Sequence, residues 1–235
     1  HLPFEPADYR NLLGSNGEQT IGGMIACGIS GPRRIQVGSC RDSLIGVRFV
    51  NGNGDIIKSG GRVMKNVTGY DLVKLLAGSY GTLGVITQVS FKLLPTPEKT
   101  ATVILHSLDD HQAVAAMSKA LGSPFDLSGA AHLPADRSRS ITLLRLEGFE
   151  KSVNYRAGKL SELLSSFGKT EIETDSEMTK IRWKKITDIE AFAQQSAAVW
   201  RLSLKPGDSS QVVNAIGQSR EVEALYDWGG GLVWL

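Results

Sequence analysis

The feature that most constrains this chain is the run Gly78–Thr87, which reads GSYGTLGVIT. Its glycines, at positions 78, 81 and 84, permit tight turns and leave backbone N–H groups uncovered. The run then passes directly into apolar, β-branched residues, which favour a buried strand. Bare amides anchored by a strand are typical of a phosphate site, so we expect a nucleotide to bind here.

A second run of small residues, Thr20–Gly28, lies upstream and is compatible with a turn or short helix that approaches a charged or flat group closely. The loop Gly28–Arg34 follows it and carries two cations. For either glycine-rich run alone, glycines that merely mark turns explain the pattern equally well. Two such runs in one stretch favour a single dinucleotide held from two sides.

Between these runs the sequence predicts a β-hairpin. Leu44–Val50 and Asp55–Lys58 are short β-type segments separated by Asn51–Gly54. An Asn-Gly pair supplies the positive φ angles of a primed turn. Gly52 and Gly54 could also suggest a dinucleotide fingerprint, but a third glycine is missing and no helix follows, so we prefer the hairpin.

A domain boundary is expected near residue 98. A short helical pattern over 70–77 ends at Gly78, a long strand is predicted over Leu83–Leu94, and Pro95-Thr96-Pro97 then breaks regular structure. Of the 26 glycines, 16 precede this point, and all four tryptophans follow it. We therefore predict one domain over residues 1–97 and a second over residues 98–235.

The second domain is predicted to be ferredoxin-like, with the order βαββαβ. The six segments are Thr100–His106, Asp109–Leu121, Asp126–Leu133, Ser140–Glu147, Lys151–Phe167 and Lys169–Thr174. A helical stretch over 175–195 follows. A second, partial set comes last: a strand Ala198–Lys205, a helix Ser209–Ser219, a strand Glu223–Trp228 and a strand from Gly231. The predicted fold class is α+β.

The charge of the chain argues against nucleic acid as a partner. The chain has 26 basic and 24 acidic residues, a net charge of +2, and no basic run interleaved with aromatic residues, so we expect no nucleic-acid binding. Residues 1–97 carry 10 basic against 6 acidic side chains, and residues 98–235 carry 16 against 18. The mildly positive first part suits an anionic ligand.

Two cysteines, Cys27 and Cys40, are too few for a disulfide framework and form no C-x-x-C pair, which favours a reducing compartment. The sequence has no apolar run of transmembrane length. It opens on His1 and stops on Leu232–Leu235, so both ends are expected to be cut. His106 and His111 flank Asp109 and Asp110, a pattern that fits a helix start better than a metal site.

Four motifs, in this order, resemble the later part of an FAD-binding domain of the vanillyl-alcohol-oxidase (PCMH) type. They are Thr20–Gly23, Gly38 with Arg41-Asp42, Lys65–Leu72 (KNVTGYDL) and Gly78–Thr87. The resemblance is strongest to the flavin subunits of bacterial glycolate oxidases. Ile29–Arg34 and Asp227–Gly230 are similar to the smaller, E-type flavin subunit rather than the larger D-type one.

The resemblance implies an FAD whose pyrophosphate and flavin lie along Ile21–Gly31 and whose adenine half lies near Gly81–Ile86. The candidate cofactor-binding residues are Thr20, Ile21, Gly22, Gly23, Cys27, Gly28, Ser30, Gly31, Gly38, Gly81, Thr82, Gly84, Val85 and Ile86. Cys27 is expected to be a buried small side chain rather than a redox thiol. Nothing before Thr20 matches the family's first phosphate-binding loop, so the chain is expected to be a fragment that lacks half of the cofactor cradle.

On the substrate side, the resemblance points to Lys65, Thr68 and Tyr70 as candidates to line the reactive face of the flavin. In related 2-hydroxyacid dehydrogenases an arginine beside this motif holds the substrate carboxylate, whereas Met64 stands before Lys65 here. An apolar side chain cannot form the bidentate clamp of a guanidinium group. No histidine follows His132 to hold a metal or take a proton, and no metal site is predicted.

Three functions remain open at this point. The first is an FAD-binding subunit of a glycolate-oxidase-like complex, which passes electrons from a small 2-hydroxy acid toward an iron–sulfur partner. The second is a self-sufficient FAD-dependent D-2-hydroxyacid dehydrogenase. The third is a non-catalytic scaffold whose tryptophans and second-domain strands form an interface. For the first, the resemblance implies a larger flavin subunit and an iron–sulfur subunit as partners, and a cytoplasmic protein that reaches the inner face of the membrane through them.

Overall fold

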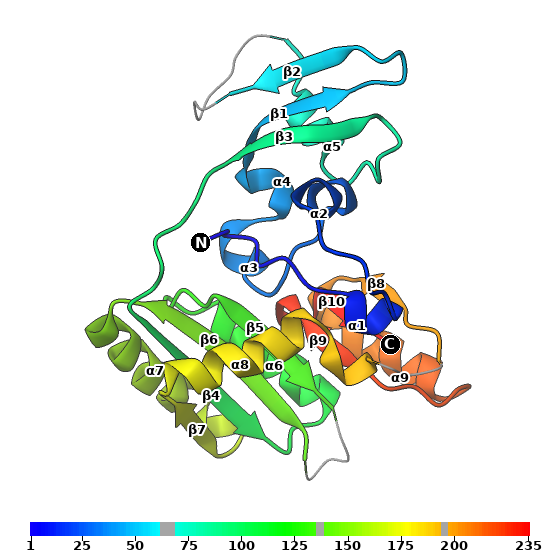
Figure 1. The fold of residues 1–235 in the computed structure, drawn as a ribbon. Helices are drawn as coiled ribbons and strands as arrows, with labels where there is room; N and C mark the ends of the chain where they lie inside the picture. Colours follow the sequence, from blue (N-terminus) through cyan, green and yellow to red (C-terminus); the bar gives the residue numbers. More distant parts are fainter. Residues whose placement is uncertain (62–68, 135–138, 194–196) are drawn as a thin grey trace. The chain divides into compact units, whose positions relative to one another are not determined.

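A computed structural model describes residues 1–61, 69–134, 139–193 and 197–235. The chain divides into two compact units, His1–Thr96 and Pro97–Leu235 (Figure 1). None of the helices in these described ranges is long and apolar enough to cross a membrane.

The first unit is built on a three-stranded antiparallel sheet with the order β2-β1-β3. Its strands are β1 (Leu44–Val50), β2 (Ile56–Gly60) and β3 (Val85–Phe91). Its helices are short: α1 (Arg10–Leu13), α2 (Ile21–Cys27), α3 (Arg34–Val37), α4 (Cys40–Ser43) and α5 (Leu72–Leu76). Strand β3 is shorter than predicted, because Leu83 belongs to the preceding turn, Gly84 precedes the first paired residue, and residues 92–94 lie beyond the pairing.

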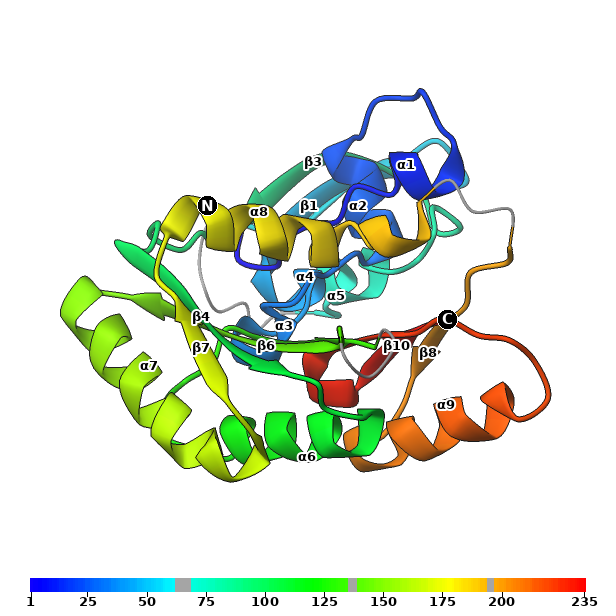
Figure 2. The same ribbon diagram turned by 90° about the horizontal axis from the view of Figure 1, so that it is seen from below.

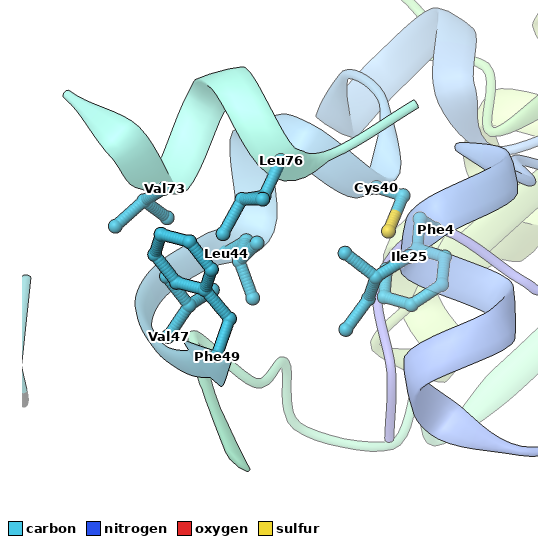
Figure 3. Close-up of a cluster of buried hydrophobic side chains, with 8 residues drawn as sticks. All are labelled: Phe4, Ile25, Cys40, Leu44, Val47, Phe49, Val73 and Leu76. Carbon is cyan, nitrogen blue, oxygen red and sulfur yellow. The ribbon is translucent and has the colours of Figure 1, made fainter. Parts of the chain in front are cut away.

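One face of this sheet carries the core of the unit. Figure 3 shows Val47 and Phe49 of β1 directed toward Val73 and Leu76 of α5, and Ile25 of α2 near Phe4 and Cys40. All eight residues of the cluster, which also includes Leu44, are at most 5% exposed. Alternation along β1 explains the arrangement, since successive side chains of a strand point to opposite faces. Arg48, between Val47 and Phe49, is exposed accordingly.

The predicted hairpin is confirmed, because β1 and β2 pair antiparallel with Val50 opposite Ile56. The primed turn is wrong. Gly54 alone in this loop has a positive φ, 85°, and Asn51 organises the loop instead. Its side-chain oxygen accepts hydrogen bonds from the amides of Asn53 and Asp55, both at 2.9 Å. An asparagine that bonds its own backbone two residues on is an alternative to the primed Asn-Gly turn.

The second unit begins with the predicted βαββαβ order. Its elements are β4 (Lys99–His106), α6 (Asp110–Leu121), β5 (Gly129–Leu133), β6 (Ile141–Gly148), α7 (Glu150–Leu164) and β7 (Thr170–Glu173). The strands pair antiparallel in the order β7-β4-β6-β5. Asp109 caps α6, since its side chain accepts from the amide of Gln112 at 2.8 Å.

The partial second set is also present. Helix α8 (Ser176–Thr187) leads to β8 (Arg201–Ser203), α9 (Ser209–Gly217), β9 (Leu225–Asp227) and β10 (Leu232–Trp234). Strand β10 lies between β8 and β9, as β6 lies between β4 and β5. Because β5 also pairs with β9, the two sets form one seven-stranded sheet, β7-β4-β6-β5-β9-β10-β8. Figure 2 shows α6, α7 and α9 on one face of this sheet and α8 on the other.

Helix α8 is fixed to the sheet by Trp183, which is 2% exposed. Its indole N–H donates to the Thr102 hydroxyl at 2.9 Å, and the Arg145 guanidinium lies 4.7 Å from its ring. A Cβ at Gly129 would lie 2.7 Å from the indole, so only glycine leaves room for the ring. Of the other tryptophans, Trp234 is 7% exposed and Trp200 is 66% exposed. The tryptophans are therefore divided between core and surface.

Candidate functional site

The two glycine-rich runs come together at the contact between α2 and the start of β3. Thr20 caps α2, and its hydroxyl oxygen accepts a hydrogen bond from the Gly23 amide at 3.1 Å. A Cβ on Gly22 would lie 3.2 Å from the carbonyl oxygen of Ile86. Gly22 therefore allows the helix backbone to approach the strand more closely than any larger residue could.

The other end of α2 holds the loop that contains Gly78. The amides of Gly78 and Tyr80 donate to the carbonyls of Ile25 and Ala26, at 2.9 and 2.8 Å. Gly28 ends the helix in the left-handed conformation, with φ of 66°, and a Cβ there would lie 3.3 Å from the Gly78 Cα. Residues 20–28 and 78–86 are thus held together by backbone hydrogen bonds and by close contacts at glycines.

Within the loop, positions 81 and 84 are occupied by glycine for different physical reasons. Gly84 has φ of 150°, and a Cβ would lie 2.5 Å from the carbonyl oxygen of Val50, so the strand pairing itself requires glycine. Gly81 has φ of 74°, but a Cβ there would meet nothing within 4 Å. Thr82 holds the turn, since its amide and hydroxyl both donate to the Ser79 carbonyl, at 3.0 and 2.6 Å. Gly81 is therefore open to a ligand.

Exposed apolar side chains surround these glycines. Ile21, Tyr80, Leu83 and Val85 are 41%, 74%, 45% and 68% exposed. Thr20, Gly23, Gly81 and Thr82 are exposed as well. Exposed glycine backbone bordered by apolar side chains suits a ligand that combines phosphate groups with flat rings. The residues present therefore fit one side of an FAD site.

Other candidate cofactor-binding residues make contacts inside the unit. The buried Ser30 hydroxyl accepts a hydrogen bond from the Cys40 amide at 2.9 Å, and the Gly31 amide donates to Phe4 at 2.8 Å. Gly38 has φ of 82°, and a Cβ would lie 2.8 Å from the Asp42 carboxylate. These three residues shape the loop. The expectation for Cys27 is wrong: its side chain is exposed, since it lies at the last position of α2 on the face away from Ile25.

The loop after α2 carries a cation that is already neutralised. Arg33 is 7% exposed, and its guanidinium lies 3.4 Å from the Glu5 carboxylate, which also accepts the Arg33 amide at 2.9 Å. The sequence reading missed Glu5, which lies 28 residues away in the chain. The positive φ of Glu5, 45°, is a local sign of its fixed position, but only the fold reveals its partner.

Of the candidates for the reactive face, Lys65 and Thr68 lie outside the described residues, as does Met64. Tyr70 is described and is 92% exposed. Next to it, Asp71 caps α5 by accepting the Lys74 amide at 3.1 Å. Tyr70 therefore directly precedes the N-cap of α5, and its ring is exposed to solvent.

A buried polar cluster in the second unit was not predicted. The Tyr226 hydroxyl donates to the Asp110 carboxylate at 2.5 Å, and His132 Nε2 lies 3.6 Å from the other carboxylate oxygen, beyond hydrogen-bond distance. His132 Nδ1 bonds the Thr142 hydroxyl at 2.9 Å. Burial acts to raise the pKa of Asp110. His132 and Tyr226 outweigh this effect and hold the pKa below its ordinary value. Burial first, and then the carboxylate, raise the pKa of Tyr226.

This cluster lies at the edge of a groove of about 1100 Å³ within the second unit. Asp110 lines the groove together with Arg139, Phe192, Glu223 and Leu225. Sequence patterns do not reveal it, because Tyr226 lies 116 residues from Asp110, and the pairing of β5 with β9 brings it opposite His132. His106 lies apart, with Nε2 3.1 Å from Glu171. No three potential metal ligands gather among the residues described.

Comparison with known proteins places this arrangement in a family. Residues 9–60 match the family described as FAD binding domain. Glycolate oxidase subunit GlcE of Escherichia coli (strain K12) is 35% identical over 235 residues, 100% of this chain and 58% of that protein. Glycolate oxidase subunit GlcD of Bacillus subtilis (strain 168) is 33% identical over 232 residues, 88% of this chain and 48% of that protein. The chain thus spans about half the length of the curated relatives it matches.

A solved structure supports the fold. Alkyldihydroxyacetonephosphate synthase aligns with a TM-score of 0.67 at 16% identity, covering 100% of this chain and 52% of that one. At this identity the likeness concerns the fold alone. The matched residues 9–60 and the full-length similarity to glycolate oxidase subunits agree with the α2–β3 geometry, and this part of the chain belongs to the FAD binding domain family.

Proposed function

We propose that the protein containing this chain is an FAD-binding subunit of a glycolate-oxidase-like complex. It takes part in electron transfer from a small 2-hydroxy acid toward an iron–sulfur partner. The observation that carries the proposal is the direct contact of residues 20–28 with residues 78–86, because that contact joins both glycine-rich runs into one ligand surface. The relatives GlcE and GlcD are both named as glycolate oxidase subunits.

FAD, when bound, accepts the electrons of the substrate on its flavin ring. The residues of this chain bind and orient it. Exposed backbone around Gly81 faces the phosphate groups, and Ile21 and Leu83 offer apolar cover. Val85 contributes its backbone to this surface, because its side chain lies on the opposite face of the sheet from Ile86. Lys65, Thr68 and Tyr70 remain candidates for the reactive face of the flavin.

We propose that the partners of the protein are a larger flavin subunit and an iron–sulfur subunit. We also propose that the protein is cytoplasmic and reaches the inner face of the membrane through those subunits. Unit 1, His1–Thr96, supplies the later half of the FAD-binding domain, and unit 2, Pro97–Leu235, supplies a ferredoxin-like domain. The net positive charge of the first part favours the anionic cofactor.

The test uses the intact protein, purified alone and together with the two partner subunits. We expect a flavin absorption spectrum in both preparations and strong glycolate-dependent dye reduction only with the partners. Strong reduction by the protein alone would favour the self-sufficient dehydrogenase instead. A colourless protein that still co-purifies with its partners would contradict the proposal and favour the scaffold.

A further inference from the structure

The face of the first-unit sheet opposite the core carries an unusual combination of side chains. The register places three cross-strand rows on it: Ile56–Val50–Val85, Lys58–Arg48–Gln88 and Gly60–Gly46–Ser90. Ile56 and Val85 are 74% and 68% exposed, and Arg48, Lys58 and Gln88 are exposed as well. We call this set of nine residues the open sheet face. It consists of an apolar row, a cationic row and a row of small residues in which Gly46 is buried.

Arg48 and Lys58 stand directly opposite each other on paired strands. Like charges in this position repel each other and destabilise the pairing. Within the described part of the chain, neither side chain has an ion pair or hydrogen bond. The sheet therefore bears two adjacent positive charges that the unit itself leaves uncompensated.

The acidic residues of the unit are used elsewhere. Of its six acidic side chains, five accept hydrogen bonds from other groups. These contacts are Glu5 with Arg33, Asp8 with Arg10, Asp42 with Ser39, Asp55 with Asn51, and Asp71 with the Lys74 amide. Among the described residues, none of the six acidic side chains, Glu18 included, forms an ion pair with Arg48 or Lys58, so this part of the unit leaves the cationic row uncompensated.

A cavity lies beside the two cations. Arg48, Lys58, Gly46, Gly60 and Ser90 are among the residues that line a cavity of about 330 Å³. Close backbone packing explains these glycines, because a Cβ on Gly46 would lie 2.8 Å from the Gly61 carbonyl oxygen. Gly46 is therefore buried beneath the backbone of Gly61, and the cavity lies beside both cations.

From these observations we propose that the open sheet face is a docking surface for a partner protein that presents carboxylate side chains beside apolar ones. The carboxylates pair with Arg48 and Lys58, and the apolar side chains cover Ile56, Val50 and Val85. Uncovered β-branched residues beside unpaired charges match a mixed protein surface better than a small anion, which would leave the apolar row exposed.

The dimensions of this face make it one part of a larger contact. Strand spacing and rise give three strands and three rows a span of about 10 by 14 Å. That is roughly a sixth of the ~800 Å² that each partner buries in a standard interface. The proposal rests on the proposed function for the identity of the partner, which is the larger flavin subunit of the complex.

The test measures binding of the intact protein to the purified larger subunit by biolayer interferometry. The double variant Arg48→Glu/Lys58→Glu preserves the like-charge pair across the strands, so its effect on folding is small, but it reverses the sign presented to a partner. We expect at least tenfold weaker binding. The control Arg41→Glu makes the same kind of charge change on exposed α4, on the core side of the sheet, and is expected to bind normally.

A carbodiimide gives a second measurement. It joins the Lys58 amine to a nearby carboxylate as an amide with loss of water, and we expect a crosslink to an aspartate or glutamate of the partner. If the double variant binds as well as the wild type, or disrupts only self-association, the docking surface is refuted while the proposed function stands. If the wild-type protein holds flavin but does not bind the larger subunit, both the docking surface and that partner are refuted, and the FAD assignment stands.

Discussion

Replacing Gly81 by alanine is the sharpest test of the ligand surface. Gly81 has φ of 74°, and an added Cβ would meet nothing within 4 Å. The substitution therefore costs only the strain of a left-handed alanine, about 1–2 kcal/mol. Gly54 offers a matched control, because its φ is 85° and an added Cβ there also meets nothing within 4 Å, at the tip of the hairpin. Both variants are expected to lose about the same stability.

Flavin binding should separate the two variants. At Gly81 the new methyl group occupies the space that a phosphate needs to reach the backbone amides, whereas at Gly54 no ligand is proposed. Loss of one hydrogen bond to a charged group costs about 1.5–3 kcal/mol, which corresponds to roughly 10- to 150-fold weaker binding. We therefore expect Gly81→Ala to lose most of its FAD and Gly54→Ala to retain it.

The assay is the ratio of flavin to protein absorbance in the purified intact protein, followed by FAD titration of the apoprotein. Thermal unfolding of the apoprotein checks the match, and for a unit of this size the expected loss in Tm is about 4–8 °C per kcal/mol for both variants. If Gly81→Ala keeps as much flavin as Gly54→Ala at equal stability, the run 78–86 does not face the cofactor and the reasoning fails.

Three further outcomes follow from buried side chains. Gly129→Ala brings a methyl group 2.7 Å from the buried indole of α8 and should cost about 1–3 kcal/mol of unfolding free energy in urea titrations; an unchanged midpoint would contradict the packing. Because the pKa of Asp110 is lowered in the folded state, its contribution to stability is present at neutral pH and lost as the pH falls through that pKa. Tyr226→Phe should therefore destabilise the protein more at pH 7 than near pH 3, and equal losses at both would refute the assignment. Burial raises the pKa of Cys40 to about 12, so iodoacetamide at pH 8 should alkylate the exposed Cys27 and spare Cys40, as read by peptide mass mapping.

Local sequence was sufficient wherever a short-range rule decides the outcome. Asn51–Gly54 predicted the hairpin, Asp109 predicted the start of α6, and the strand and helix periods predicted the βαββαβ order. The primed turn was wrong because a side-chain hydrogen bond from Asn51 competes with the backbone geometry of the turn. The glycine-rich runs and the motifs around them were enough to indicate an FAD-binding family.

The sequence by itself thus determined the elements, their order and the kind of ligand, because these depend on residues close together in the chain. Only the tertiary structure decided which glycines are required by packing and which have open space beside them. Gly84 is required by the close approach of Val50, whereas Gly81 is open. It also paired Arg33 with Glu5 and placed Arg48 beside Lys58, with no counter-charge among the residues that the structure describes. Such charge relations depend on strand register and on contacts between distant segments, which no local pattern encodes.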